Sequence, residues 1–249
     1  MNYGKWYYRD YFDRLRLDNE GQLKVPEKFG HGGDALSQVR QVPPFLESLK
    51  SVKGFELQTT YPGLLCGIGY HHEVNRPKEE GQEQGKKKDE PLLYQLGLYF
   101  DYSSGLPVIP GSSIKGALRS AIKEWEFLKG ADTDKPWSGW STKNFIKEVF
   151  EGEGQSIYER DIFLDAIPIE VSEQGLFGED YITHHPSPLK EPNPVRFLRV
   201  NPGVTYLFRF ILQDRAGFGA KDKLKLFKEI ILALGLGAKT NVGYGRFQK

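Results

Sequence analysis

The chain has 249 residues, enough for one large domain or two small ones, and its 39% hydrophobic content can supply a core. A formal net charge of +1 argues against a polybasic tail protein, although local basic patches still permit nucleic-acid binding. The single cysteine, Cys66, excludes an internal disulfide and a multi-cysteine zinc site. The N-terminus lacks the apolar stretch of a secretory signal, and no apolar run reaches the length of a membrane span. We therefore expect a cytoplasmic protein without membrane contacts.

The first third of the chain divides into an extension, a strand and a polar loop. Residues 1–50 mix aromatic and arginine residues with a short helical signal that begins at Asp34, and we expect them to form an N-terminal extension packed on the core. Residues 53–60 alternate between apolar and polar side chains, which predicts a strand. Residues 75–91 are almost free of apolar side chains, so we expect a mobile loop there. Residues 92–102 again favour a strand.

A helix is predicted to follow Pro110, with Ser112 or Ser113 as its N-cap. Apolar residues recur at steps of three and four and predict one buried face: Ile114, Ala117, Leu118, Ala121, Ile122, Trp125 and Leu128. The opposite side carries a basic stripe, defined as Lys115, Arg119 and Lys123. Gly116 costs a helix about 1 kcal/mol relative to alanine. It therefore suggests the close approach of another element or of a ligand.

The rest of the chain continues to alternate between strands and helices. The pattern predicts a strand at 160–170 and two strand segments within 195–212, which a turn at Asn201-Pro202-Gly203 separates. It also predicts a helical insertion at 129–159 with its helix at 141–150, a long polar insertion at 171–194, a helix at 221–235 and a final strand. The resulting order is strand, helix, strand, strand, helix, strand. That order is typical of an α+β, ferredoxin-like domain, the framework of the RNA-binding RRM. We expect residues 51–249 to form this one domain.

Two glycine-rich basic segments carry the functional signals. In GLGAKTNVGYGRF (235–247), the glycines let the backbone approach a polyanion, and polar and basic side chains offer contacts to phosphate or ribose. Tyr244 is a candidate for stacking on a base. A tight helix-to-strand turn with a surface lysine explains the segment equally well. A nucleotide-binding P-loop is rejected because Ala238 precedes Lys239 and because the segment follows a helix.

The second segment is PVIPGSSIKGALRS (107–120), at the start of the predicted helix. A helix N-terminus has free N–H groups and favours anions, so a phosphate contact is expected near the two serines and Lys115. An ordinary capped amphipathic helix is the alternative. The segment is a weak signal by itself and becomes specific in combination with the first one.

Together the two segments resemble those of the RAMP superfamily of CRISPR effector proteins, which carry a helix start of this kind and a C-terminal glycine-rich loop. More locally, the chain resembles the sixth-subunit family of type III-B (Cmr) complexes in FELQTTYPGLLCGIGYHHE (55–73), FDYSSGLPVIPGSS (100–113), FLDAIPIE (163–170) and GVTYLFRF (203–210). The resemblance covers most of residues 53–247. It implies a noncatalytic backbone subunit that holds guide RNA toward its 3′ end and supports target RNA recognition in antiviral defence.

The resemblance also implies partners and sites. The partners are guide CRISPR RNA, target RNA, a neighbouring RAMP backbone subunit, a small helical subunit and a capping RAMP subunit. The RNA-binding positions carried over are Gly111, Ser112, Ser113, Lys115, Gly116, Arg119, Lys239, Thr240, Asn241, Gly243, Tyr244, Gly245 and Arg246. The 171–194 insertion would be a projecting hairpin that contacts the guide–target duplex. No cofactor and no metal are implied.

A catalytic site remains the alternative, as a metal-independent endoribonuclease of the same superfamily that processes guide RNA. His184 or His185, with Tyr181 and Lys190, offers the residue types needed for general acid–base cleavage of RNA. A metal site would use His71, His72 and Glu73. Adjacent residues diverge on both strands and helices, so neither histidine pair makes an easy ligand pair. Asp34 and Asp180 are candidate loop aspartates, and Asp34 equally suits a helix cap. We expect no catalytic residue.

Overall fold

The computed structural model describes, with their side chains, residues 52–66, 98–102, 104–129, 134–181, 197–215 and 217–249. It adds the backbone of 16–17, 23–24, 72–74, 93–95, 182–184 and 193–196. The predicted helix from Asp34 and the predicted loop 75–91 lie outside these residues. Within the part of the chain that is described, no helix combines the length and apolar character needed to cross a membrane.

A five-stranded antiparallel sheet forms the centre of the molecule. Its order is β11-β3-β10-β6, and β7 also pairs with β10. The strands are β3 (Val52–Thr59), β6 (Ile162–Phe163), β7 (Ile167–Glu170), β10 (Thr205–Ile211) and β11 (Phe247–Gln248). From Tyr206 onward in β10, buried and half-buried residues alternate, as expected for a strand whose one face meets the core. The predicted strands at 53–60 and 160–170 are confirmed, the second as two short pieces.

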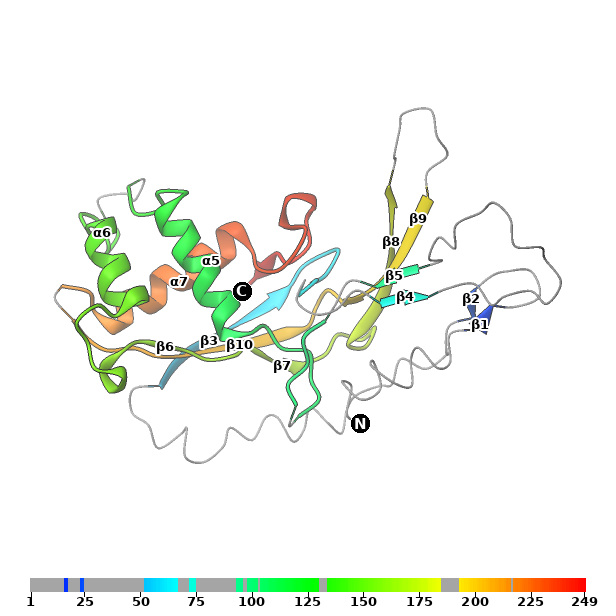
Figure 1. Ribbon diagram of the computed structural model, residues 1–249, viewed down its shortest axis with the longest axis horizontal. Helices are drawn as coiled ribbons and strands as arrows, with labels where there is room; N and C mark the ends of the chain where they lie inside the picture. Colours follow the sequence, from blue (N-terminus) through cyan, green and yellow to red (C-terminus); the bar gives the residue numbers. More distant parts are fainter. Residues whose placement is uncertain are drawn as a thin grey trace, which may run out of the picture.

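Two helices cover one face of this sheet (Figure 1). Along the chain, α5 (Gly111–Lys123) comes after β3 and before β6, and α7 (Ala220–Leu234) comes after β10 and before β11. The predicted mixture of helices and antiparallel strands is therefore confirmed. Aromatic side chains join the two layers, since the ring of Phe227 on α7 lies 5.6 Å from Phe163 and 5.5 Å from Phe210. The buried ammonium of Lys223 donates to Asp161, so the one charged pair in this core is satisfied among the described residues.

The predicted helix at 141–150 is present as α6 (Thr142–Phe145), which continues into a π-helical turn, η2 (Ile146–Glu151). Gly152 ends it in the left-handed conformation, with φ +62°. Phe145 is buried and packs on Phe218 with ring centroids 5.2 Å apart. The predicted apolar face of α5 is wrong at Trp125, which lies beyond the end of the helix and is 69% exposed.

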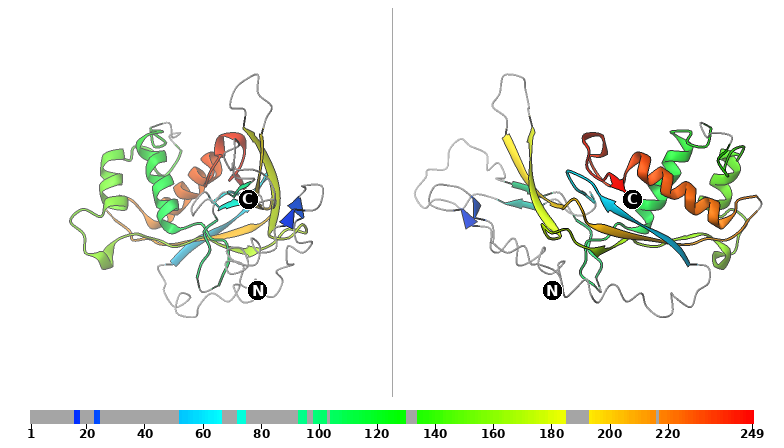
Figure 2. Two further views of the ribbon diagram at one scale, coloured as in Figure 1. Left: turned by 45° about the vertical axis from the view of Figure 1, so that its right-hand side comes forward. Right: turned by 180° about the vertical axis from the view of Figure 1, so that it is seen from behind.

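A long hairpin of β8 (Phe177–His184) and β9 (Asn193–Val200) projects from the end of the sheet opposite to α6 (Figure 2). The predicted break at Asn201–Gly203 is confirmed, because β9 ends just before it and β10 begins just after it. The hairpin nevertheless takes residues 195–200, which lie beyond the predicted insertion 171–194. Two short pairs complete the described strands: β1 (Arg16–Leu17) with β2 (Leu23–Lys24), and β4 (His72–Val74) with β5 (Leu93–Gln95).

Candidate nucleic-acid interface

Helix α5 begins at Gly111, and a distant carboxylate caps it. The Gly111 amide donates to Asp165 Oδ1 at 2.7 Å, and Asp165 lies in the turn between β6 and β7. Neither Ser112 nor Ser113 makes a capping hydrogen bond with its side chain, so the predicted serine cap is wrong. Because Asp165 already places a negative charge at this helix start, the N-terminus alone is a weaker anion site than the sequence predicts.

Gly116 lies on the exposed side of α5. A Cβ atom added to it would have no neighbour within 4 Å. Among the described residues, no other element therefore approaches Gly116, and packing does not explain why glycine stands at this helical position. The sequence suggests the close approach of either another element or a ligand. Since no described element approaches Gly116, the geometry favours a ligand.

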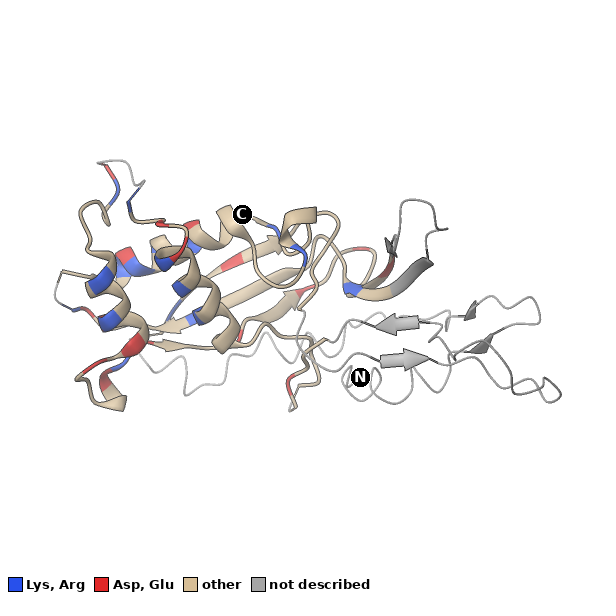
Figure 3. Ribbon diagram, turned by 45° about the horizontal axis from the view of Figure 1, so that its top comes forward, with Lys and Arg blue, Asp and Glu red and all other residues tan. Residues whose placement is uncertain are grey.

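The basic stripe is present on the helix, but its members have different surroundings. Lys115 holds its ammonium 5.7 Å from the centre of the Phe163 ring, a cation–π geometry. Arg119 donates to Glu151 of η2 at 2.9 Å, with both side chains about two-fifths exposed. Lys123 is exposed at the end of the helix. Figure 3 shows that blue lysine and arginine segments gather on this side of the molecule.

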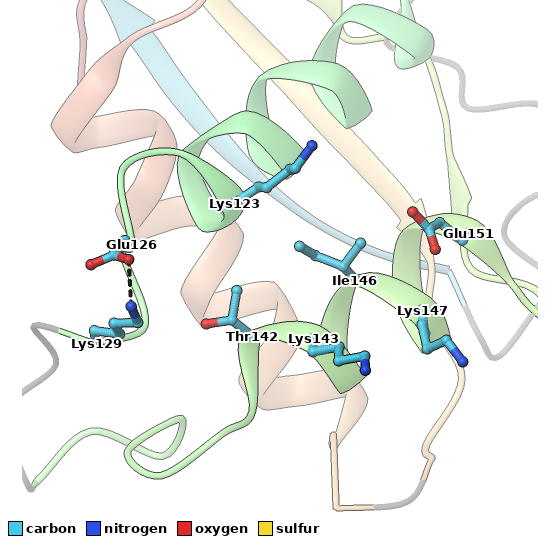
Figure 4. A pocket seen from close by; sticks show the side chains of 8 residues that line it. All are labelled: Lys123, Glu126, Lys129, Thr142, Lys143, Ile146, Lys147 and Glu151. Atoms are coloured by element: carbon cyan, nitrogen blue, oxygen red, sulfur yellow. Dashed lines mark hydrogen bonds and ion pairs between the residues drawn. The ribbon is translucent and has the colours of Figure 1, made fainter.

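Beyond Lys123, the stripe continues into an open hollow of about 460 Å³ between α5 and α6 (Figure 4). Four lysines line it: Lys123, Lys129, Lys143 and Lys147. Lys129 pairs with Glu126, and Lys147 pairs with Glu153 at 2.7 Å. No ion pair joins Lys123 or Lys143 to another described residue. Sequence reasoning missed Lys143 and Lys147, although their spacing of four on a predicted helix was a usable signal.

The glycine-rich loop (residues 235–246) folds back onto the protein itself. It leaves α7, makes the short 3₁₀ turn η4 (Thr240–Val242) and enters β11. Four glycines have positive φ: Gly235, Gly237, Gly243 and Gly245. A Cβ atom would collide with the carbonyl oxygens of Gly245, Leu65 and Leu236 at the first, second and fourth of them. These three glycines therefore serve the turn and its packing, which favours the turn explanation over a backbone opened to a polyanion.

The exposed tip of the loop carries Lys239, Asn241 and Val242. Lys239 has φ +59°, in the left-handed region that a non-glycine residue rarely adopts. Thr240 is half-buried beside it. The tip thus presents one cation and one amide at a strained turn, which suits contacts with phosphate or ribose.

Two predicted contact residues of the loop are held by contacts within the protein. The Tyr244 side chain is only 6% exposed, and its hydroxyl donates to Asp180 Oδ2 at 2.6 Å. Burial, and then this hydrogen bond, raise the pKa of Tyr244. Its predicted stacking on a base is wrong, because the ring lies against Phe197 with centroids 5.8 Å apart. Arg246 donates to the Ala233 carbonyl at 2.6 Å and so caps the C-terminal end of α7.

Asp180, a candidate catalytic aspartate, joins the hairpin to the glycine-rich loop. Besides accepting from Tyr244, its carboxylate faces Arg199 Nε of β9 at 3.3 Å. Arg199 in turn donates to Asn201 Oδ1 at 2.8 Å. These contacts give Asp180 a structural role, because its carboxylate links the hairpin to the loop.

Of the remaining catalytic candidates, only Tyr181 has a described side chain. Tyr181 is exposed, whereas the side chains of His71, His72, Glu73, His184, His185, Lys190 and Asp34 lie outside the described residues. No group of three His, Cys, Asp or Glu within the described side chains is arranged to hold a metal ion. The start of α5 and the glycine-rich loop both rise from the helix-covered side of the sheet, and the loop stands between the helices and the hairpin (Figures 1 and 2).

Comparison with known proteins identifies a family and a curated relative. A family model described as the RAMP superfamily matches residues 31–248. The CRISPR system CMR subunit Cmr6 of Saccharolobus solfataricus is 33% identical over 165 residues, which cover 63% of this chain and 50% of that protein. The chain thus spans about half the length of this curated relative.

Two solved structures are also similar. A chain of the cryo-EM structure of the type III-B Cmr-beta bound to cognate target RNA is 25% identical, with a TM-score of 0.58 over 85% of this chain and 64% of its own length. The crystal structure of Cmr6 from Pyrococcus furiosus is 20% identical, with a TM-score of 0.39 over 80% of this chain and 97% of that chain.

Proposed function

Since the chain belongs to the RAMP superfamily, we propose that it is a noncatalytic subunit of a type III-B CRISPR (Cmr) ribonucleoprotein that binds guide RNA by its backbone. The observation that carries the proposal is Gly116, an exposed helical glycine with open space beside it, flanked by Lys115. The likeness to a Cmr6 protein and to a chain of a target-bound Cmr complex supports it.

The physical argument concerns how close a sugar–phosphate backbone can come to α5. Without a side chain at Gly116, a polyanion can lie against the helix backbone, where Lys115 and Arg119 flank the flat surface. The exposed Lys239 and Asn241 offer contacts of the same kind from the glycine-rich loop. Such contacts read no bases, as expected of a protein whose guide RNA must stay free to pair with its target.

Finer parts of the proposal concern architecture and partners. The strand order β11-β3-β10-β6, with a helix after β3 and another after β10, supports a ferredoxin-like core within one domain, residues 51–249. Residues 1–50 would be its extension. The β8–β9 hairpin would contact the guide–target duplex. The protein would bind the guide RNA toward its 3′ end, beside a neighbouring RAMP subunit and a small helical subunit. The complex would be located in the cytoplasm. The use of Asp180 in a structural junction supports a noncatalytic role.

Removal of charge from the two segments tests the proposal. We expect the Lys115→Gln, Lys239→Gln double variant to bind a labelled, guide-length single-stranded RNA about tenfold more weakly. Each lost phosphate contact should also reduce the slope of log K against log salt by about 0.7. Arg119 and Arg246 are not substituted, because Arg119 also pairs with Glu151 and Arg246 also donates to the Ala233 carbonyl.

The matched control is Lys221→Gln, Lys225→Gln, which removes two exposed charges from the first turns of α7. The 15 residues of this helix separate its start from the glycine-rich loop by about 20 Å. If both double variants changed affinity and salt slope equally, or if neither did, specific phosphate contacts at the two segments would be refuted. Cleavage of labelled repeat RNA by the purified protein would overturn the noncatalytic role.

A further inference from the structure

Tyr61 stands out because it is exposed where its neighbours are not. The five residues that follow it, 62–66, are all buried, whereas the Tyr61 side chain is 83% exposed. No hydrogen bond or ring contact joins Tyr61 to another described residue. The core therefore does not require an aromatic side chain at this position, and another reason for it must be sought.

The backbone around Tyr61 is fastened to the glycine-rich loop. The Thr60 amide donates to the Arg246 carbonyl at 3.0 Å, and the Gly245 amide donates to the Gly63 carbonyl at 2.8 Å. A Cβ atom added to Gly243 would lie 3.3 Å from Pro62 Cδ, so the residue that directly follows the tip of the loop borders this turn. Tyr61 thus carries an exposed ring on a backbone that is hydrogen-bonded to the loop both before and after this residue.

The other side of the turn is held as well. The amides of Leu64 and Val200 donate to each other's carbonyl oxygens at 3.0 and 2.9 Å, which ties the turn to the base of the β8–β9 hairpin. Beyond it, Tyr244 and Asp180 join the loop to the same hairpin. A ring presented from such a fixed point loses little conformational entropy when a flat ligand covers it.

The chemistry beside Tyr61 suits a nucleotide. The bordering loop tip offers the Lys239 ammonium, at a strained left-handed residue, and the exposed Asn241 amide. An aromatic face next to a cation is the usual arrangement for single-stranded nucleic acid, since the base stacks while the phosphate meets the charge. Sequence reasoning assigned the stacking role to Tyr244, which is buried, and Tyr61 is the exposed aromatic residue beside the same loop.

We propose that Tyr61 stacks on an unpaired base of single-stranded RNA whose backbone contacts the Lys239–Asn241 tip of the glycine-rich loop. This inference rests on the proposed RNA-binding function and adds a residue and a ligand class to it. Stacking on a tyrosine face tolerates any base but requires that the face of the base be free, so the ligand is single-stranded RNA and not the interior of a duplex.

The test uses the whole chain and three variants: Tyr61→Leu, Tyr61→Phe and Tyr102→Leu. Tyr102, 98% exposed, is the matched control because it is a solvated tyrosine on another turn. We expect Tyr61→Leu to weaken binding of fluorescein-labelled single-stranded RNA about tenfold, consistent with the loss of one stacked base. The salt slope should stay unchanged, because no charge is removed, and Tyr61→Phe and Tyr102→Leu should bind like the parent protein.

The outcomes separate this inference from the function on which it rests. If Tyr61→Leu bound RNA normally while Lys115→Gln, Lys239→Gln did not, the stacking role would be wrong and the RNA-binding function would stand. If the parent protein bound no RNA at all, both would fall. If Tyr61→Leu kept its RNA affinity but no longer joined other subunits in reconstitution, Tyr61 would be a protein contact. Equal denaturation midpoints for all variants confirm that folding does not cause the difference.

Discussion

In the glycine-rich loop, three glycines lie against carbonyl oxygens of the protein's own backbone, whereas Gly116 in α5 faces open space. The two segments carry the same residue types, and in the sequence they make the same case for phosphate binding. Their difference teaches that a glycine has to be interpreted through what fills the space beside it. Where the chain fills that space, folding requires the glycine. Where nothing fills it, the glycine lowers helix stability, and the reason for it lies outside the chain.

The substitution Gly245→Ala is the strongest test of the statement that folding requires the glycines of the loop. Its Cβ would collide with the Leu236 carbonyl oxygen, and its φ of +66° is unfavourable for alanine. We expect a loss of at least about 3 kcal/mol in the free energy of unfolding, measured by urea denaturation, because a backbone atom cannot move aside as a side chain could.

Gly154→Ala is the matched control for this variant. Gly154 has a similar φ of +72° but nothing within 4 Å of its Cβ position. It therefore isolates the cost of the left-handed conformation, about 1 kcal/mol. Equal losses for the two variants would show that contact with the chain does not matter at Gly245, and the contrast with Gly116 would then disappear.

The next largest effect is expected from Tyr244→Phe. The variant keeps the ring against Phe197 but removes the hydroxyl that donates to Asp180, so a charged acceptor loses a partner. Hydrogen bonds to charged groups contribute about 1.5–3 kcal/mol, and we expect a loss in that range by urea denaturation. RNA affinity at a temperature well below the transition should stay unchanged. A variant of unchanged stability that lost RNA binding would instead restore Tyr244 as a ligand contact.

These expectations also show which parts of the site follow from local sequence. The basic stripe on α5 could be predicted because helical periodicity decides which residues share a side, and Lys115, Arg119 and Lys123 do share one. The turn after Asn201 and the helix at 141–150 could be predicted for similar reasons, since turn residues and apolar spacing are local signals.

The errors at the site all involve partners that are distant in the chain. Asp165 displaces the serines as the cap of α5 from 54 residues away, and Asp180 captures Tyr244 from 64 residues away. No local pattern reports such pairs, because only the folded topology brings them together. Tyr61 was missed for the converse reason, since an aromatic residue within an apolar segment is normally assigned to the core.

Alkaline pH should lower the free energy of unfolding, because it favours the release of protons from buried thiol and phenol groups. Burial raises the pKa of the Cys66 thiol from 9.0 to about 12, and it raises the pKa values of Tyr206 and Tyr244 as well. The folded state therefore keeps these protons while the unfolded state releases them. The stability contributed by Cys66 is fully present below about pH 9 and is lost as pH rises toward about 12, by about 1.4 kcal/mol per pH unit.

Urea denaturation between pH 8 and pH 11 measures this loss. In Cys66→Ala the decline with pH should be shallower by about 1.4 kcal/mol per unit above pH 9, whatever the variant's overall stability. An identical slope in parent and variant would show that the thiol is not shielded from water in the folded state. The region beside the glycine-rich loop would then be more open than its buried side chains indicate.

The smallest effect on stability, and the most informative for function, is expected from Gly116→Ala. Open space at the Cβ position means that alanine fits without strain, and helix propensity should raise the free energy of unfolding by about 1 kcal/mol. If a sugar–phosphate backbone lies against this side of α5, the added methyl group should nevertheless weaken RNA binding. Gains in stability and losses in affinity from one methyl group would mark a position kept for a ligand at the expense of the fold. Gly154→Ala adds the same methyl group to an exposed glycine outside α5 and should leave RNA affinity unchanged, so an equal effect of both substitutions would remove Gly116 from the interface.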